Sequence, residues 1–386
     1  MKIRTIASVA TLVGVFAGTP AMQAEDEAGS FISLPKNVES IKLYGDARFR
    51  YQFENAKSFG STTDKERSRW RYRARFGSIV NFKDSNVSMG VRAETSKNND
   101  STNANFGGYF DKVGDELFLG LVYITYEGEN LTVSAGKQKH PFKISSAWWD
   151  SDINPEGISE SFSVGDWNFN FGQYIVDETK ESSSSGEDDF LFVAQGVWKT
   201  GDVTLAPIVL GSAGGKADAS ETSGNFSGEN SNGYFHDFLV VALPFEVKLN
   251  SGKLFGTVGL NLKGDDAAAE PTSPFYDGGN GTNENLFFNF GYQFGSAKKA
   301  GQWQAGVEYR YIEAAAYTPN LSDSDFGKNS TNQEGLVAKY KYMATDFLSY
   351  GVTAFLTDSI DDSDYWGDAI SKGKTTMLQV DAAIKF

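Results

Sequence analysis

Arginine side chains are concentrated in one short part of this sequence and recur there at every second position. Beyond residue 24 the chain has nine arginines, eight of which are Arg48, Arg50, Arg67, Arg69, Arg71, Arg73, Arg75 and Arg92. Side chains two residues apart share one face of an extended strand. A guanidinium group stays charged and pairs with carboxylate or phosphate. The spacing predicts a wall of positive charge, which either takes part in solute binding or is only a salt-bridged surface.

Acidic residues that could face this arginine wall occur in the segment 140–157. It holds Asp150, Asp152 and Glu156 beside two tryptophans and two prolines. Carboxylates opposite guanidinium groups would create a field across the space between them, which orients dipolar solutes and discriminates by charge. The alternative is an exposed loop whose acidic side chains are simply solvated.

Residues for catalysis or metal binding do not form a recognisable pattern. The only histidines are His140 and His236, there is no cysteine, and no Gly-x-Ser-x-Gly turn occurs, so the sequence does not indicate an enzyme. Acidic residues near the end of the chain could hold Ca²⁺, but their spacing does not match an EF-hand loop. We expect no cofactor, with Ca²⁺ at these loops as the alternative to solvated acids; the residues are Asp358, Asp361, Asp362, Asp364 and Asp368.

Apolar and polar residues alternate in short segments from residue 41 to the last residue. In the final segment Leu378, Val380, Ala382, Ile384 and Phe386 share one face, and the residues between them form the other. Strands of this kind suit a barrel with lipid outside and water inside. Sixteen can be placed, at 41–53, 67–82, 87–96, 116–127, 131–139, 158–164, 167–176, 190–199, 203–210, 235–249, 253–263, 285–294, 302–313, 335–344, 347–357 and 375–386. We predict an all-β fold, a 16-stranded antiparallel transmembrane β-barrel.

The connections between these strands alternate between seven tight turns and eight longer loops. In an outer-membrane barrel with an even number of strands, short turns lie on the periplasmic side and long loops outside the cell. Pro207 and Pro244 fall within two of the predicted strands. Because proline cannot donate to the ladder, we expect a bulge or an earlier strand end at each.

The first residues have the pattern of a secretory signal peptide, with Lys2 and Arg4 before an apolar stretch and small residues at Ala21 and Ala24. We expect cleavage after Ala24, a short periplasmic segment over residues 25–40, and the barrel over residues 41–386. Beyond residue 24 the chain carries 33 lysines and arginines against 50 acidic residues, a net charge of −17. This acidity disfavours binding to nucleic acid.

Several short motifs resemble the putative porins of Gram-negative bacteria. They are Leu43-Tyr-Gly-Asp46, Ala135-Gly-Lys-Gln138, Trp149-Asp150, Asp152-Ile-Asn-Pro-Glu-Gly157 and the terminal aromatic strand. The resemblance implies a 16-stranded barrel in the outer membrane and passive diffusion of small hydrophilic solutes and ions. It also implies that the loop 140–157 folds into the barrel opposite the arginine wall.

Partners follow from the same resemblance: outer-membrane lipid, the barrel assembly machinery, and two further copies of the chain in a trimer. Phe386 completes the outward-facing row of the last strand, so we expect it to act as the assembly signal. Two alternatives remain open. One is an anion- or phosphate-selective channel that uses the arginines as a binding ladder, and the other is a structural or adhesive surface barrel with a plugged pore. The sequence does not indicate the natural solute.

Overall fold

The computed structural model describes residues 34–57, 64–96, 101–107, 117–177, 189–213, 238–264, 284–318, 321–327, 331–360 and 373–386. The expected signal peptide, residues 25–33 and the acidic residues at 361–368 lie outside the described residues. The chain divides into two compact units, Met1–Lys36 and Asn37–Phe386. Every strand belongs to the second unit, which is described below.

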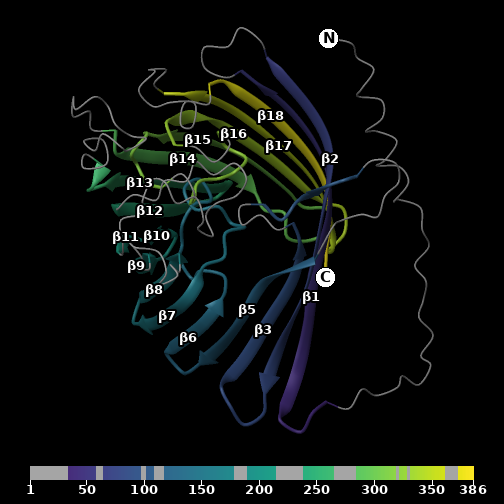
Figure 1. Ribbon diagram of the computed structural model, residues 1–386, viewed down its shortest axis with the longest axis vertical. Helices are drawn as coiled ribbons and strands as arrows, with labels where there is room; N and C mark the ends of the chain where they lie inside the picture. The colour runs from purple at the N-terminus through teal and green to yellow at the C-terminus, as the bar shows by residue number, and fades with distance from the viewer. Residues whose placement is uncertain are drawn as a thin grey trace, which may run out of the picture. The chain divides into compact units, whose positions relative to one another are not determined.

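One antiparallel sheet contains all the strands (Figure 1). Its segments are β1 (Val38–Ala56), β2 (Lys65–Phe82), β3 (Val87–Thr95), β4 (Ala104–Asn105), β5 (Leu117–Glu127), β6 (Leu131–Lys137), β7 (Glu156–Val164), β8 (Trp167–Asp177), β9 (Asp189–Thr200), β10 (Val203–Leu205), β11 (Ile208–Ala213), β12 (Leu239–Leu249), β13 (Gly252–Asn261), β14 (Leu286–Gly295), β15 (Trp303–Ile312), β16 (Gln333–Met343), β17 (Leu348–Ser359) and β18 (Thr375–Lys385). β4 is a two-residue bridge on β2, and β10 and β11 are halves of one strand between β9 and β12. Sixteen full strands remain, which confirms the predicted number.

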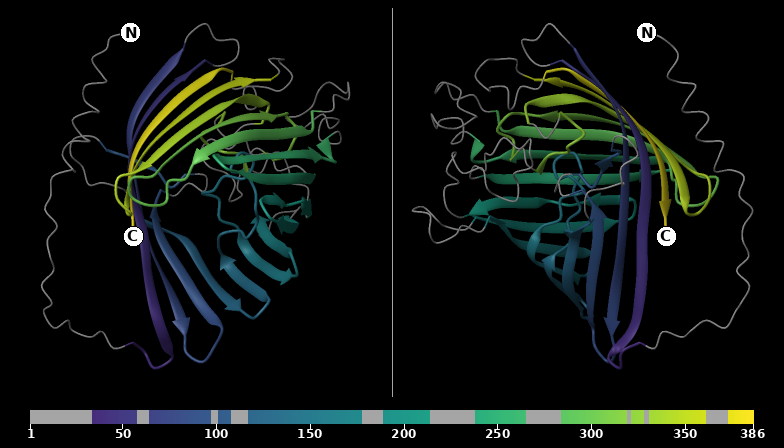
Figure 2. Two further views of the ribbon diagram at one scale, coloured as in Figure 1. Left: turned by 180° about the vertical axis from the view of Figure 1, so that it is seen from behind. Right: turned by 45° about the vertical axis from the view of Figure 1, so that its right-hand side comes forward.

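The sheet closes on itself because β1 pairs with β2 on one side and with β18 on the other. Figure 2 shows β1 and β18 together from two directions. Gly45 and Phe386 complete the closure, since the N–H group of each donates to the carbonyl oxygen of the other at 3.1 Å. A closed ladder leaves no unpaired edge, which is the condition for strands to cross a membrane.

Side-chain burial follows the alternation that the sequence predicts. On β1, Leu43 is 72% exposed and Phe49 48%, whereas Arg50 is 5% exposed and Gln52 1%. Successive side chains of a strand point to opposite faces, so on β1 the apolar residues cover the outer wall and the polar residues line the interior. The outer apolar band is the surface that lipid would cover.

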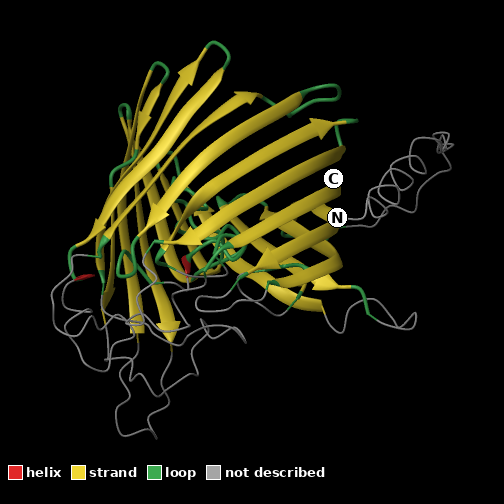
Figure 3. Cartoon of the chain, turned by 90° about the horizontal axis from the view of Figure 1, so that it is seen from above, coloured by secondary structure: helices red, strands yellow, loops and turns green. Residues whose placement is uncertain are grey.

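Connections of different length gather at opposite ends of the strands. Seven turns of two to seven residues join β2 to β3, β5 to β6, β7 to β8, β9 to β10, β12 to β13, β14 to β15 and β16 to β17; Figure 3 shows such turns at one end of the strands. The eight other connections are longer. Within the described part of the chain, no helix has the length and apolar character needed to cross a membrane.

The two prolines affect their strands differently. The strand is interrupted at Ala206 and Pro207, between β10 and β11, as predicted. The expectation for Pro244 was wrong, because β12 continues through it and Pro244 pairs with Thr257 of β13. Its carbonyl oxygen accepts the N–H group of Ala206 at 2.9 Å. The backbone nitrogen of Pro244, which has no hydrogen to donate, therefore faces the interruption. There Gln195 Nε2 donates to the Ala206 carbonyl oxygen at 3.3 Å instead.

Candidate functional site

The connection between β6 and β7, residues 138–155, lies against the inner face of the barrel and is called the first inner loop below. The Lys143 N–H group donates to Gln195 Oε1 of β9 at 2.8 Å, and Gln195 Nε2 donates to the Lys143 carbonyl oxygen at 3.0 Å. Farther along, the Trp148 ring lies 5.3 Å from the Phe287 ring of β14. These contacts attach the loop to the wall formed by β9 and β14.

An apolar core inside the barrel explains this attachment. Many inward side chains of this wall are apolar: Val176, Leu191, Val193, Ile208, Leu210, Val240, Ala242 and Phe287. Trp148 and Trp149 pack among them and are 1% and 2% exposed. Burying an indole removes about 200 Å² from water, worth roughly 5 kcal/mol. This core fills the interior along β8 to β14, whereas the arginine wall lies on β1 to β3.

A second inner loop, which sequence reasoning missed, follows β15 and includes the described residues 313–318 and 321–327. Its contacts with the first inner loop include three hydrogen bonds between described residues. The Asp150 N–H group donates to the Leu321 carbonyl oxygen at 2.8 Å, the Ser324 N–H group donates to Asp150 Oδ2 at 3.0 Å, and Tyr317 Oη donates to the Ala147 carbonyl oxygen at 3.2 Å. The two loops therefore hold each other in place inside the barrel.

Arg310, the one arginine beyond residue 24 that lies outside the first three strands, fixes the second inner loop to the wall. It is fully buried, and its guanidinium group lies 3.0 Å from Glu308 Oε2 and 2.7 Å from Asp323 Oδ2. Its Cζ atom also lies 5.0 Å from the centre of the Phe326 ring. A signal was present in the sequence: an isolated arginine on the polar face of a strand needs an acidic partner, and the next loop supplies Asp323 and Asp325.

The arginine wall contains its own acidic partners. Across β1 and β2, Arg48 faces Arg73 and Arg50 faces Arg71, and like charges in such positions repel each other. Asp46 offsets part of this repulsion, because its oxygens lie 2.7 Å from Arg73 and 2.7 Å from Arg75. On the other side of β1, Asp381 of β18 accepts two hydrogen bonds from Arg50, at 2.7 and 2.9 Å.

The remaining predicted arginines have local partners. Arg69 lies 3.7 Å from Glu54, and Arg92 lies 2.6 Å from Glu94. Arg71 donates to Gln52 Oε1 at 3.0 Å and, at 3.2 Å, to both Ser101 Oγ and the Asn103 carbonyl oxygen. Arg48 donates to Asn103 Oδ1. The segment around Asn103 thus meets two arginines with neutral groups.

The structure separates the three predicted acids of the first inner loop. Asp152 lies 3.6 Å from Arg75 and accepts from the Thr102 N–H group at 3.3 Å. Asp150 binds the second inner loop as described above. Glu156 does not face the arginines: it is the first residue of β7, it shares the side of that strand that carries Ile158, and it pairs with Lys137 at 2.6 Å. Because side chains alternate along a strand, the place of Glu156 in β7 decides the direction of its side chain. The predicted end of the loop at residue 157 was too late.

A polar cavity of about 290 Å³ lies between the arginine wall and the two inner loops. Its charged lining residues are Arg48, Arg50, Arg73, Lys339, Asp150, Asp152, Asp323, Asp325 and Asp381. Burial and, after it, the neighbouring carboxyl group of Asp323 raise the pKa of Asp150 to about 8, although hydrogen bonds from the Ser324 and Asp152 N–H groups act in the opposite direction. For Asp325 burial also acts upward, but Arg50 and a hydrogen bond from Gln379 hold its pKa below the ordinary value. The cavity therefore combines both signs of charge.

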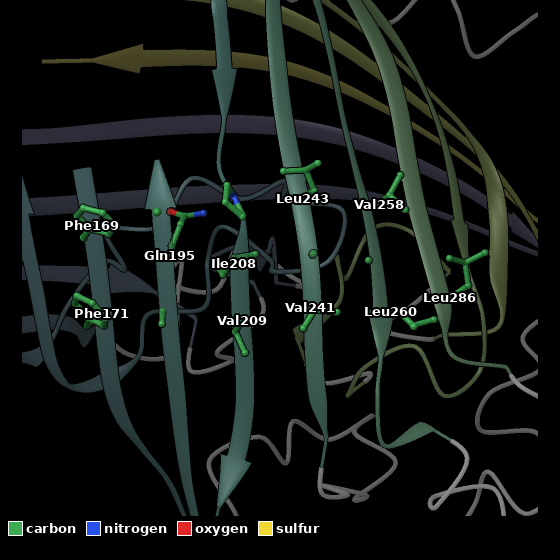
Figure 4. Close-up of a pocket in the computed structure, with 15 residues that line it drawn as sticks. Phe169, Phe171, Gln195, Ile208, Val209, Val241, Leu243, Val258, Leu260 and Leu286 are labelled. Atoms are coloured by element: carbon green, nitrogen blue, oxygen red, sulfur yellow. The ribbon is translucent and has the colours of Figure 1, made fainter. Parts of the chain in front are cut away.

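An apolar hollow lies on the outer wall (Figure 4). It measures about 750 Å³, spans β8 to β14 beside Pro207, and is lined by apolar side chains such as Phe169, Val209 and Leu243. Its position in the outward apolar band makes it a surface for lipid rather than for a hydrophilic solute. Among the described residues, no cluster of histidine and acidic side chains has the arrangement of a metal site.

Comparisons with known proteins agree with this architecture. Residues 54–198 match the family described as putative porins. The resemblance to putative porins is therefore confirmed. This segment runs from the end of β1 to β9, so it includes most of the arginine wall and the whole first inner loop. A search of curated protein sequences gives no match.

Solved porin structures share the fold at low sequence identity. OmpF of Salmonella typhi, in complex with daunomycin, is 10% identical with a TM-score of 0.53, covering 90% of this chain and 97% of its own. The outer membrane channel DcaP of Acinetobacter baumannii is 17% identical with a TM-score of 0.52, covering 90% and 97%. The anion-selective porin from Comamonas acidovorans is 12% identical with a TM-score of 0.53, covering 90% and 99%.

Proposed function

We propose that this chain is an outer-membrane porin, a passive diffusion channel for small hydrophilic solutes and ions. The observation that carries the proposal is the division of the interior of a closed barrel. One wall is filled by apolar loop side chains, and the other keeps a polar cavity lined by Arg48, Arg50, Arg73 and several aspartates. A charged, hydrated path beside a packed loop is what a selective pore needs.

In this proposal the two inner loops and the arginine wall form the constriction. The pairs of Arg50 with Asp381 and of Arg75 with Asp152 bring both signs of charge to the narrow region. Most of the excess acid of the chain then lies elsewhere, where salt screens it within about 8 Å at physiological ionic strength. Selectivity is set locally by the few charges that solutes pass, not by the net charge of −17.

Location and assembly follow from the same architecture. The signal peptide 1–24 is removed on export, the short turns face the periplasm and the long loops face outside, as in other barrels of this type. The closing bonds between Phe386 and Gly45 support a role for the terminal residue in assembly. A trimer is the proposed assembly state, by analogy with general porins.

Single-channel recording in planar bilayers tests the function. A general porin conducts both ions of potassium chloride in an ohmic manner.

The alternative of an anion- or phosphate-selective channel is favoured by the positive charge of Arg48, which has no carboxylate within ion-pair distance among the described residues. It predicts a reversal potential near that of chloride and block by phosphate. A plugged surface barrel, favoured by the apolar core, would insert without measurable conductance.

A further inference from the structure

Most charges around the polar cavity neutralise one another. Arg50 binds Asp381 and Asp325, at 2.7 and 3.4 Å. Arg73 is held by Asp46, and Asp323 by Arg310. Charges paired at these distances are largely unavailable to a passing solute, because a solute group would have to replace an existing partner.

One guanidinium group in this cavity is an exception. Arg48 lies on β1 in the middle of the arginine wall, and its only hydrogen bond among the described residues goes to the neutral amide of Asn103. Its Nε atom is buried and has no hydrogen-bond partner there. Lys339 of β16 lines the same cavity, again without an ion pair in the described part of the chain. Positive charge is therefore available on this side.

One carboxyl group is the corresponding exception. Asp150 is 7% exposed and accepts hydrogen bonds only from backbone N–H groups, those of Asp152 at 2.9 Å and Ser324 at 3.0 Å. No lysine or arginine lies within ion-pair distance of it among the described residues, whereas Asp152, Asp323, Asp325 and Asp381 each have one. The cavity is thus lined by one carboxyl group and one guanidinium group that form no ion pair within the described part of the chain, Asp150 of the first inner loop and Arg48 of β1.

We propose that this cavity is a binding subsite for small zwitterions of the amino-acid type, whose carboxylate binds Arg48 and whose ammonium group binds Asp150. The inference rests on the proposed channel function and specifies the solute class of its constriction. A volume of about 290 Å³ equals the liquid volume of about ten waters, which suits a solute of about ten non-hydrogen atoms. A zwitterion compensates both groups at once.

Simple ions match this lining less well. A phosphate ion at Arg48 would enter a cavity that five aspartates line. A cation at Asp150 would approach Arg48, Arg50, Arg73 and Lys339 without supplying an anion to them. Each kind of ion is attracted by one group that has no ion-pair partner and is repelled by the charges of its own sign. Charges that stay unpaired in a partly desolvated site also reduce the binding free energy. The opposed arrangement therefore favours a solute with both charges.

Proton release accompanies this binding. Burial and the carboxylate of Asp323 in the second inner loop raise the pKa of Asp150, with Asp152 acting in the same direction from its own loop. Asp150 is therefore mostly protonated in the empty cavity at neutral pH, and an ammonium group stabilises its ionised form. Binding of the zwitterion should strengthen as pH rises from 6 to 8.

The experiment measures block of the potassium current by three related solutes in planar bilayers that contain the full chain. The solutes are glutamine, N-acetylglutamine, which lacks the ammonium group, and glutaminamide, which lacks the carboxylate. Ionic strength is kept at 0.1 M so that the lumen charges are not fully screened. A screened ion pair contributes up to about 1 kcal/mol, so glutamine should block at an about fivefold lower concentration than either analogue.

Substitutions identify the two groups. Arg48→Gln should remove the advantage of glutamine over glutaminamide, and Asp150→Asn, which keeps one of the two oxygens that accept loop N–H groups, should remove its advantage over N-acetylglutamine. Arg48→Lys should retain most of the effect. Lys298→Gln and Glu129→Gln, exposed positions outside the cavity lining and outside the arginine wall, are the matched controls and should behave like the unmodified chain.

Three results would overturn the inference. Equal block by the three solutes, or unchanged block in both cavity variants, would show that the two groups do not bind the solute. Phosphate block at a lower concentration than glutamine block would identify an anion site instead. In each of these cases the channel conducts and the proposed function stands, whereas a barrel that inserts and carries no potassium current refutes the proposed function as well.

Discussion

Replacement of Arg310 by methionine should detach the second inner loop from the barrel wall while the barrel remains folded. Arg310 is fully buried between Glu308 and Asp323, and methionine keeps the apolar contact with Phe326 but leaves both carboxylates without their cation. Removal of one partner of a buried ion pair costs about 3 to 5 kcal/mol. The backbone ladder of the closed barrel is untouched, so the loss should appear as local opening of the loop.

Thiol labelling measures this opening. The chain has no cysteine, so Leu321→Cys introduces a unique thiol at a position that is 1% exposed. When opening is fast relative to labelling, the labelling rate follows the open population. A cost of 3 to 5 kcal/mol then corresponds to labelling faster by a factor of about a hundred to a few thousand. Open-channel current should also become noisier, because the first inner loop loses its partner.

A matched control and a compensating variant define what would refute this reasoning. Arg67→Met removes an exposed arginine and should leave the labelling rate unchanged. The triple variant Glu308→Gln, Arg310→Met, Asp323→Asn removes the unpaired charges and should recover much of the protection. If Arg310→Met alone labels within about threefold of the parent, the ion pairs do not anchor the loop and its position depends on packing.

Three further predictions concern pH, assembly and selectivity. Since the pKa of Asp150 is raised to about 8, the packing of the inner loops is most stable below the ordinary carboxyl range and is weakened as pH rises towards about 8; without added solute, current noise should increase over this range, and should not in Asp150→Asn. Deletion of Phe386 removes the closing bonds to Gly45 and should lower the amount of heat-modifiable barrel in the outer membrane; equal amounts and equal protease resistance would count against the assembly role. Replacement of Arg71 and Arg73 by serine should shift the reversal potential in a salt gradient towards cations, and neutralisation of Asp150 and Asp152 should shift it towards anions; unchanged potentials in both would mean that these residues are wall structure only.

The fold was predictable because a barrel strand repeats one physical rule many times. Each strand faces lipid on one side and water on the other. The alternation of a segment such as 378–386 is therefore enough to predict a barrel strand, without knowledge of the strands beside it. The interruption at Pro207 was predictable for the same local reason. The continuation of β12 through Pro244 was not predictable. Its missing N–H donor is tolerated only where the adjacent strand is itself interrupted, and the sequence does not show which strand becomes the neighbour of Pro244.

The candidate site shows the same limit at the level of charge. Alternation correctly places Asp46 and Asp381 on the inner face, but their function depends on register. Closure of the barrel sets Asp381 opposite Arg50, and the pairing of β1 with β2 sets Asp46 opposite Arg75. Pairing with Asp46 and Asp381 makes the net charge of the arginine wall far less positive than the arginines alone suggest. The sequence does not show this pairing, because the acidic partners come from strands at both ends of the chain. Arg48 and Asp150, the two groups of the proposed subsite, remain outside these ion pairs, and neither is distinguishable in the sequence from its paired neighbours.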